Sequence, residues 1–395
     1  MKLLVYSHYF APSIGGVETI VMSLARGLAE LRLDDGAPEF ELTLATQTPR
    51  SNFDDASLPF RVVRQPGLWQ LLRLVREADI VHLAGPSFAP MLLARLTGKP
   101  FVVEHHGYQA VCPNGLLVHM PDRAICPGHF QARNYSECLR CESAQNSFVK
   151  AATKVLAGMP RISLVRRAAA NIAVSRHVQD RVSAPHSQVI YHGVEAPPAA
   201  TIYSDIPAGA EAKVCFTFIG RFVWEKGISV FVTALALLRK SGLKFEAKLI
   251  GDGPERPKLE SEIDRAGLKP FVRLTGYLTE DAIAAELGGT SVIVMPSICE
   301  ETAGLAAIEQ MVRGRLIVAS HIGGLSEIVG EAGLKFPPGD SAALATQMKA
   351  VIENPKLISN FGAKARSTGL ARFERSSMIG KHAALYRQLA DLSAK

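Results

Sequence analysis

The sequence of 395 residues lacks any long hydrophobic run, and this absence excludes one large class of proteins. No apolar stretch approaches the ~20 residues that a membrane-spanning helix requires. The first apolar run ends after Tyr6, which is too short for the hydrophobic region of an export signal. We therefore expect a protein that stays in the cytoplasm, either free or peripherally attached to the cytoplasmic face of a membrane.

Runs of lysine and arginine with interleaved aromatic residues are also missing, as are short internal repeats. The formal net charge of +7 suits an anionic partner, such as nucleic acid, anionic lipid or a sugar phosphate. Without a basic and aromatic run, nucleic acid is the least favoured of the three, and we expect no nucleic acid partner. The length, with 48% hydrophobic residues, is sufficient for two domains with large cores.

What the sequence contains is an alternation of short apolar runs with amphipathic stretches, which is typical of parallel sheets covered by helices. The strands predicted in the first half are Leu3–Tyr6, Leu42–Ala45, Ile80–Leu83, Phe101–Glu104, Ile172–Val174 and Val189–Tyr191. Those predicted in the second half are Cys215–Ile219, Glu246–Ile250, Val272–Thr275, Ser291–Met295 and Leu316–Ser320. The predicted helices include Val17–Glu30, Ile228–Lys240, Leu305–Arg313, Ser341–Glu353 and Pro355–Gly362. The fold class is therefore α/β, with two doubly wound, Rossmann-like domains.

The segment 194–207 contains two adjacent prolines and no amphipathic period, so it predicts a linker. We place a first domain at 1–195 and a second at 207–375, and we expect a last helix at 376–395 to pack on the first domain. Ligands of open α/β sheets bind where strands end and loops lead into helices. Two such domains facing across a cleft would supply loops from both sides.

The most informative stretch is 295–310, where a predicted strand leads through a polar turn into a helix. The first N–H groups of a helix have no partner within it, so Gly304 and Leu305 could donate hydrogen bonds to a phosphate. Glu309 would lie roughly 7 Å further along the helix, within reach of the ribose of a nucleotide. Glu301, before the helix, would face the other end of the ligand. Solvated surface carboxylates are the alternative interpretation.

Other strand ends of the second domain also carry residues suited to a nucleotide. The segment Gly220–Gly227 holds Arg221, which offers a planar fork of donors, and Lys226, which offers a compact charge. Both cations could reach a diphosphate. The turns at Gly251 and Tyr277 could receive a base through their backbone groups. A solvated loop is the alternative for Lys226, and the flanking glycines make that alternative less favoured.

In the first domain, two strand ends carry candidate ligand contacts. Gly15 and Gly16 precede a predicted helix and could offer backbone donors to an anion or a sugar, although glycine pairs are also ordinary turn residues. His106 follows the strand Phe101–Glu104 and could bind a hydroxyl or relay a proton, because its pKa lies near physiological pH. A hydrogen-bonded structural histidine is the equally favoured alternative.

In its order along the chain, this set of residues resembles the retaining nucleotide-sugar glycosyltransferases of family 4, which have the GT-B fold. The motifs that carry the resemblance are Gly15-Gly16, His106-Gly107, Gly220-Arg221 with Lys226-Gly227, Gly251-Asp252-Gly253-Pro254, and Glu301 with Gly304-Leu305 and Glu309. They cover nearly the whole chain. One departure is Thr302-Ala303, where many members have a small residue followed by an aromatic, so the walls of the sugar pocket are expected to differ.

The resemblance implies roles for these positions. The catalytic residues would be His106, Arg221, Lys226 and Glu301. The donor-binding residues would be Gly15, Gly16, Arg221, Lys226, Gly251, Tyr277, Glu301, Gly304, Leu305 and Glu309. Arg221 and Lys226 would hold the diphosphate, Glu301 the donor sugar and Glu309 the ribose. The resemblance also implies that catalysis requires no divalent metal or other cofactor.

The expected function is transfer of a sugar, with retention, from a nucleotide-diphosphate sugar donor to a hydroxyl of a lipid-linked oligosaccharide or another glycan acceptor. The rival enzymes are a GT-B sugar-nucleotide epimerase and a phosphorylase, although no cofactor lysine or phosphate pocket of a phosphorylase is found. A non-catalytic sugar-nucleotide-binding protein is the rival of another class. A glycosidase would need two opposed carboxylates around a sugar, whereas Glu309 is placed for ribose.

Four of the six cysteines lie within one segment of the first domain, at about 108–145. They are Cys112, Cys126, Cys138 and Cys141. The spacing of the last two is that of a zinc knuckle, and four thiolates could form a tetrahedral structural zinc site. Disulfides are disfavoured in a reducing cytoplasm, and redox-active or merely buried thiols are the alternatives. The wide gaps on either side of Cys126 are irregular for a zinc module.

Two segments of the first domain are rich in basic residues. Between 123 and 181 the lysines and arginines exceed the acids by ten to three, and the second cluster lies at 61–76. The members of this second cluster are Arg61, Arg64, Trp69, Arg73 and Arg76. Mixed apolar and basic residues suit an anionic membrane surface, and an ordinary solvated basic face is the alternative.

Overall fold

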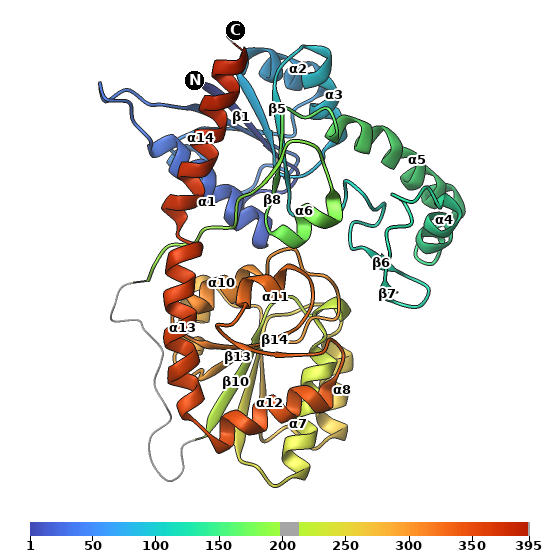
Figure 1. The fold of residues 1–395 in the computed structure, drawn as a ribbon, viewed down its shortest axis with the longest axis vertical. Coiled ribbons are helices and arrows are strands. Elements are labelled where there is room, and N and C mark those ends of the chain that lie inside the picture. Colours follow the sequence, from blue (N-terminus) through green and yellow to red (C-terminus); the bar gives the residue numbers. More distant parts are fainter. Residues whose placement is uncertain (198–212, 394–395) are drawn as a thin grey trace. The chain divides into compact units, whose positions relative to one another are not determined.

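The structure is a computed structural model that describes residues 1–197 and 213–393 (Figure 1). The chain divides into two compact units, Met1–Gly193 with Arg375–Lys395, and Val194–Glu374. Each unit is built on a parallel sheet with helices, which confirms the predicted α/β fold class. The predicted linker at 194–207 lies largely outside the described residues. Among those that are described, no helix is long and apolar enough to cross a membrane.

The first unit contains a seven-stranded sheet in the order β3-β2-β1-β4-β5-β8-β9. Its strands are β1 (Lys2–Ser7), β2 (Glu41–Thr46), β3 (Arg61–Arg64), β4 (Ile80–Leu83), β5 (Phe101–His105), β8 (Ala170–Ala173) and β9 (Ser187–Val189). All neighbouring strands pair in parallel. Parallel strands covered on both faces need continuous apolar sequence, and all four residues of β4 are buried.

The helices of this unit connect the strands and add one distant segment. They are α1 (Gly16–Glu30), α2 (Leu68–Glu77), α3 (Phe88–Leu96), α5 (Phe148–Val165), α6 (Arg176–Val182) and α14 (Arg375–Ser393). A small insertion between β5 and α5 contains β6 (Val118–His119), β7 (Ala124–Ile125) and α4 (Tyr135–Ser143). Helix α14 packs against α1 and β4, and Arg387 forms an ion pair of 2.6 Å with Glu39.

The second unit contains a six-stranded parallel sheet in the order β12-β11-β10-β13-β14-β15. Its strands are β10 (Val214–Ile219), β11 (Phe245–Ile250), β12 (Val272–Gly276), β13 (Val292–Met295), β14 (Leu316–Ser320) and β15 (Leu334–Phe336). Its helices are α7 (Ile228–Lys240), α8 (Arg256–Arg265), α9 (Glu280–Leu287), α10 (Leu305–Met311), α11 (Gly323–Val329), α12 (Ser341–Glu353) and α13 (Lys356–Arg372). Phe216 and Phe218 of the central strand β10 anchor one continuous apolar core between sheet and helices.

Two predicted helices have different ends in the structure. Helix α10 stops at Met311, two residues before the predicted end at Arg313. Helix α13 continues to Arg372, although a stop was predicted at Gly362. The glycines of α13 serve packing rather than termination, because a side chain at Gly369 would come within 3.0 Å of Val312.

One member of the predicted basic cluster at 61–76 does not belong to the surface. The side chain of Arg64 is 7% exposed and forms an ion pair of 2.7 Å with Asp55. It also donates a hydrogen bond of 2.8 Å to the carbonyl oxygen of Ala11. Arg64 therefore joins β3 to the segments that contain Asp55 and Ala11, and only the other members remain candidates for an external contact.

Candidate active site

The strand order of the second sheet reverses between β10 and β13, which places a candidate site at this point. From β10 the chain moves outward through β11 and β12, and then adds β13, β14 and β15 on the other side. Loops that follow neighbouring strands at such a switch point diverge, and open α/β sheets bind ligands there. Lys226 follows β10 and Glu301 follows β13, so the fold brings these two predicted residues together.

Lys226 and Glu301 form an ion pair, with the ammonium nitrogen 2.9 Å from a carboxylate oxygen. The Glu301 side chain is 11% exposed and also accepts a hydrogen bond from the hydroxyl of Ser297. Burial alone would raise the pKa of Glu301, but the Lys226 charge and the two hydrogen bonds hold that pKa below its usual range. Glu301 is therefore an anion at neutral pH, and Lys226 is the cation that faces it.

The backbone fixes the spacing of this pair. Gly227 has a φ of +65°, and a side chain there would collide with the carbonyl oxygen of Pro296. The N–H of Ile298 donates a hydrogen bond of 3.0 Å to the carbonyl oxygen of Glu225. The loop that carries Lys226 is thus joined through the main chain to the loop that carries Glu301.

A second glycine pair supports Glu301, and the sequence analysis missed it. The N–H of Gly324 donates a hydrogen bond of 2.7 Å to the carbonyl oxygen of Glu301. Gly323 has a φ of +58°, and a side chain there would lie 2.7 Å from that oxygen and 2.8 Å from the Glu301 nitrogen. A signal was available, because this glycine pair stands between a predicted strand and a helix, as Gly15 and Gly16 do.

Helix α10 begins beside the ion pair. Gly304 has a left-handed φ of +71°, and a side chain there would lie 3.7 Å from the Glu301 carboxylate. Ala307 donates the first backbone hydrogen bond back to Gly304, so the N–H groups of Gly304 and Leu305 precede the helical ladder. Glu309 is half-buried further along the helix. Because α10 has seven residues, these N–H groups act as individual donors more than through a helix dipole.

The loops after β10, β11 and β12 lie at the same edge of the sheet and carry the remaining predicted residues of this unit. The N–H of Phe222 donates to the carbonyl oxygen of Asp252 at 2.8 Å, and Gly251 packs on the carbonyl of Gly220. Arg221 is exposed between these anchors, and Tyr277 is 60% exposed after β12. The structure thus pairs Lys226 with Glu301, places Gly304 beside that carboxylate, and places Arg221, Gly251 and Tyr277 along the same edge of the sheet.

The predicted residues of the first unit lie in two separate loops of that unit. Gly15 and Gly16 form the start of α1, after β1, at the point where the strand order reverses between β1 and β4. The carbonyl oxygen of Gly15 accepts hydrogen bonds from the backbone and hydroxyl of Thr19. His106 follows β5, one strand further out than β4. The glycine pair and the histidine therefore lie in separate loops, each of which follows a strand of the sheet.

His106 belongs to a buried network that the sequence analysis did not predict. One carboxylate oxygen of Glu104 lies 3.2 Å from His82, 3.5 Å from His106 and 3.6 Å from His382, each measured to Nε2. Burial raises the pKa of Glu104, but the His106 charge and the hydrogen bonds of the three histidines hold it well below its usual range. Tyr386 of α14 closes the network through a hydrogen bond of 2.9 Å to His82.

Hydrogen bonds fix the orientation of several of these rings. His382 Nδ1 lies 2.9 Å from the carbonyl oxygen of Met378, which can only accept, so Nδ1 is the donor and Nε2 faces Glu104. His106 Nδ1 lies 3.1 Å from His192 Nε2, so one ring donates and the other accepts. Burial lowers the pKa of His192 to about 3, which keeps that ring neutral.

The same residues include a set with the chemistry of metal ligands. Within the described ranges 1–197 and 213–393, the atoms of Glu104, His106 and His192 are the group of three such ligands found within 4.8 Å of one another. His106 Nδ1 and His192 Nε2 share a hydrogen bond, whereas neither oxygen of Glu104 nor Nδ1 of His192 has a hydrogen-bond partner among the described residues. Glu104 is instead surrounded by the three histidine rings at ion-pair distance.

Comparisons with known proteins agree with this geometry. Residues 14–196 match the family model described as Glycosyltransferase Family 4, and residues 213–354 match that of the Glycosyl transferases group 1. The chain is 28% identical to a 2-deoxystreptamine glucosyltransferase of Streptomyces kanamyceticus, over 91% of this chain and 98% of the relative. It is 29% identical to a 2-deoxystreptamine N-acetyl-D-glucosaminyltransferase of Streptomyces fradiae, over 84% of this chain and 81% of the relative.

A solved structure with a similar fold is HepE of Anabaena in complex with UDP-glucose, with a TM-score of 0.72 and 18% identity over 98% of this chain and all of HepE. Two doubly wound units of this topology define the GT-B class of glycosyltransferases. With both of its units matched, the chain belongs to the glycosyltransferases of family 4. The resemblance drawn from the sequence motifs is thereby confirmed at the level of fold and family.

Proposed function

We propose that the chain transfers a glycosyl group from a nucleoside diphosphate sugar to an acceptor hydroxyl, with retention of the anomeric configuration. The observation that carries the proposal is the ion pair of Lys226 and Glu301 at the switch point of the second sheet. A cation beside an ionised carboxylate offers one group for the diphosphate and one for the hydroxyls of the sugar. The family membership supports the same assignment.

In the proposed reaction, the bond between the anomeric carbon and the β-phosphate oxygen breaks while the acceptor oxygen approaches the same face of the sugar. The acceptor proton passes to the departing phosphate, so no separate base is consumed. Negative charge grows on that phosphate, where Lys226 and Arg221 stabilise it. Such preorganised electrostatic contacts are usually the largest contribution to catalysis. Because these cations supply the positive charge, we infer that transfer needs no divalent metal.

The remaining residues of the second unit bind the donor. The N–H groups of Gly304 and Leu305 donate to a phosphate, and Glu309 accepts hydrogen bonds from the ribose hydroxyls. Glu301 contacts the sugar while Lys226 holds its carboxylate in the ionised form. Gly251 and Tyr277 receive the base. The printed names of the relatives suggest glucosyl and N-acetylglucosaminyl donors as the first to test.

In the first unit, His106 contacts the sugar or the acceptor, and Glu104 positions its ring. Gly15 and Gly16 offer backbone groups to the same ligands. A lipid-linked oligosaccharide or another glycan is our proposed acceptor. The 2-deoxystreptamine that is named for the relatives is the competing small acceptor. A transfer assay distinguishes it from a lipid-linked acceptor because only the lipid-linked product partitions into organic solvent.

A surface of α5 supports the lipid-linked acceptor. Phe148, Val149 and Leu156 are 66%, 75% and 62% exposed, and Arg166 and Arg167 are exposed at the end of the same helix. Apolar side chains beside basic ones suit the interface of an anionic bilayer. We infer peripheral binding to the cytoplasmic face of a membrane. Failure of the protein to sediment with vesicles that contain anionic lipid at low salt would remove this part of the proposal.

The test of the main proposal combines donor binding with transfer. A panel of nucleoside diphosphate sugars is screened by thermal shift, and the best ligand is then incubated with candidate acceptors. We expect a donor-dependent product with an α-linkage from an α-linked donor, determined by NMR, and the same rate in the presence of EDTA. Donor binding without transfer would favour the sugar-nucleotide-binding protein, and isomerisation of the donor would favour an epimerase.

A further inference from the structure

The insertion between β5 and α5 has little regular secondary structure, although several of its apolar side chains, such as Val111, Leu117 and Val118, are buried. Its regular structure consists of β6, β7 and α4, and the two strands have two residues each. The apolar cluster beneath it contains Phe130, Cys138 and Val155, with Tyr135 and Ile162 packed against them. Small loop-rich segments are often held by a metal ion or by covalent bonds. The insertion is therefore a segment in which a metal ion could add to the apolar packing.

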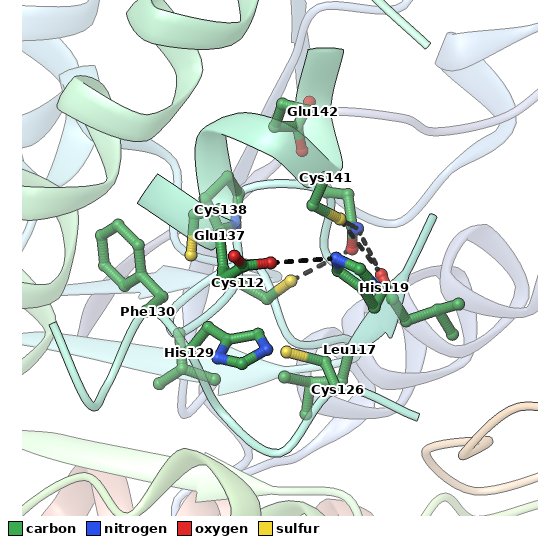
Figure 2. Close-up of a pocket in the computed structure, with 14 residues that line it drawn as sticks. Cys112, Leu117, His119, Cys126, His129, Phe130, Glu137, Cys138, Cys141 and Glu142 are labelled. Atoms are coloured by element: carbon green, nitrogen blue, oxygen red, sulfur yellow. Dashed lines mark hydrogen bonds and ion pairs between the residues drawn. The ribbon is translucent and has the colours of Figure 1, made fainter. Parts of the chain in front are cut away.

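The four cysteines of the insertion converge on one enclosed cavity. All four line it, together with His119 and His129, and their exposed fractions are between 6% and 8%. Figure 2 shows that the cysteines reach this cavity from separate parts of the insertion, with Cys138 and Cys141 on α4. Each of them is a free thiol. Residues separated in sequence by up to 29 positions thus present four soft sulfur atoms to one place.

The backbone around two of these cysteines is folded toward their sulfur atoms. Cys112 is followed by a turn in which Gly115 has a φ of +74°, and the N–H groups of Asn114, Gly115 and Leu117 face its sulfur. The sulfur of Cys141 accepts hydrogen bonds of 3.3 Å from the Met120 N–H and from the Asn114 side chain.

Donors of this kind neutralise part of the charge on metal-bound thiolates. The thiol of Cys112 donates a hydrogen bond of 3.1 Å to the side-chain oxygen of Asn114, and the thiol of Cys141 donates one of 3.4 Å to the carbonyl oxygen of Val118. Both thiols would therefore lose a proton when they bind a metal ion.

We propose that Cys112, Cys126, Cys138 and Cys141 bind one structural zinc ion as four thiolate ligands. Four thiolates in a tetrahedral arrangement select zinc or iron, and the cavity of about 10 Å³ has room for about one ion and not for an iron–sulfur cluster. Two thiolates on successive turns of one helix, three residues apart, can share a metal ion because they lie on one face.

Binding requires a small rearrangement of the side chains. Zinc–sulfur bonds are about 2.3 Å long, which brings the ligand atoms within about 4 Å of each other. In the described part of the chain, the cysteine sulfurs do not form a group within 4.8 Å. Since all four cysteines line the same cavity, we infer that rotation of the thiols about χ1 brings the sulfurs closer together. The two histidines of the cavity wall remain as possible fourth ligands only if a thiol fails to turn inward.

The zinc site would fix the conformation of the chain segment that follows His106. The N–H of Cys112 donates a hydrogen bond of 2.8 Å to the carbonyl oxygen of Tyr108, and Tyr108 in turn donates to Gly115 at 3.1 Å. An ion held by Cys112 therefore fixes the chain from Tyr108 to Gly115, directly after the histidine. The inference does not depend on the proposed transfer reaction, because metal content is measured without a substrate.

The experiment measures metal in the full chain, purified without a histidine tag from a medium with both zinc and iron. We expect about one zinc per chain and less than a tenth of an equivalent of iron. Replacement by cobalt(II) is expected to give the absorption bands of a tetrahedral four-thiolate site. The variants C112A and C138A are expected to lose the zinc, and the matched control C215A, a buried thiol of β10, is expected to keep it.

A second measurement on the unmodified chain avoids variants that fail to fold. A mercurial reagent is titrated into the protein, and the released zinc is followed with a chelating dye. We expect release of zinc as four thiols react, and an H129A variant is expected to retain the metal. Zinc far below one equivalent, iron in its place, a disulfide between Cys138 and Cys141, or zinc retained in C112A would each overturn the proposal.

Discussion

The ion pair of Lys226 and Glu301 has two separable consequences, one for catalysis and one for stability. Lys226 is 26% exposed, so a ligand phosphate can approach it, whereas Glu301 is more enclosed and depends on Lys226 to stay ionised. Without the Lys226 cation, the nearly buried Glu301 carboxylate keeps the hydrogen bond from Ser297 but has lost its ion pair. A buried charge without compensation costs more than the pair contributes.

We predict that K226M lowers kcat/KM by ~10²–10³ and also lowers the stability of the second unit by about 1–3 kcal/mol. The double variant K226M/E301Q is expected to recover most of the stability and none of the activity, because the unpaired charge is gone while the cation is still missing. Urea denaturation and initial rates measure the two effects. A K258A variant on α8 is the control and should behave as the unmodified chain, since Lys258 is exposed.

The pH dependence of this pair follows from the lowered pKa of Glu301. A depressed folded pKa contributes stability that is present above the unfolded value, about 4.3, and is lost as the pH falls through the folded value. We therefore predict that donor binding by the unmodified chain persists below pH 4.3. In K226M the burial of Glu301 acts without the neighbouring charge, so residual binding should decline at a higher pH. Isothermal titration with the donor at several pH values tests this. The same loss of binding with falling pH in the unmodified chain and in K226M would contradict it.

Gly323 gives a third test at the level of single residues. G323A places a methyl group against the backbone of Glu301 and adds strain at a φ of +58°. The control G339A has a similar φ of +78° but nothing within 4 Å of the added atom. Both variants are expected to lose about 1 kcal/mol of stability from the backbone strain. Only G323A is expected to lose activity as well, and equal activity of the two variants would argue against support of Glu301 by this glycine.

Among the elements, helix α14 is attached to the first unit by close packing on α1. Gly27 of α1 has no side chain, which lets Ile379 of α14 approach the backbone, and Arg375 donates a hydrogen bond of 3.0 Å to Ser23 nearby. The helix also supplies His382 and Tyr386 to the buried network around Glu104. Its position therefore affects both packing and the environment of His106.

We predict that G27A lowers the stability of the first unit by about 1–3 kcal/mol, because the new methyl group overlaps the side chain of Ile379. The matched control is G380A in α14, where an added methyl group meets nothing within 4 Å. There the gain in helix propensity is expected to raise stability by about 0.5–1 kcal/mol. Thermal unfolding of both variants tests the pair, and a neutral G27A would mean that α14 adjusts without cost.

The strands could be predicted from sequence because most are short apolar runs buried on both faces, as in β13 and β14. Helix ends were harder to predict, since the continuation of α13 past Gly362 depends on packing against α10. Lys226 and Glu301 were each found from their places at strand ends. Their contact depends on β10 and β13 being neighbours, which only the strand order reveals.

The network around Glu104 was even harder to predict from the sequence. His82 and Glu104 come from adjacent strands, but His382 comes from the far end of the chain. Each of them, taken singly, has no pattern in the sequence that distinguishes it from an ordinary core residue. Because the grouping arises from the return of α14 to the first unit, it could be found only in the folded chain.

For the whole molecule, the histidines are distributed unevenly between the two units. The second unit has one histidine, His321, whereas the first has all the buried ones. Burial lowers the pKa of His105 to about 4 and that of His192 to about 3. In the unfolded chain these rings bind protons near pH 6.5, so the unfolded state takes up more protons than the folded state below that pH.

We therefore predict that the first unit loses stability as the pH falls from about 6.5 toward 4, while the second unit changes little in this window. Calorimetry at pH 7 and pH 5 should show one of two transitions moving to lower temperature. The variant Y386F identifies the transition of the first unit. It removes the hydrogen bond to His82 and should lower the stability of the first unit by about 1 kcal/mol. H192N should reduce the pH dependence, because asparagine can bond to His106 without taking up a proton. An equal shift of both transitions would mean that acid acts through general charge repulsion and not through these buried rings.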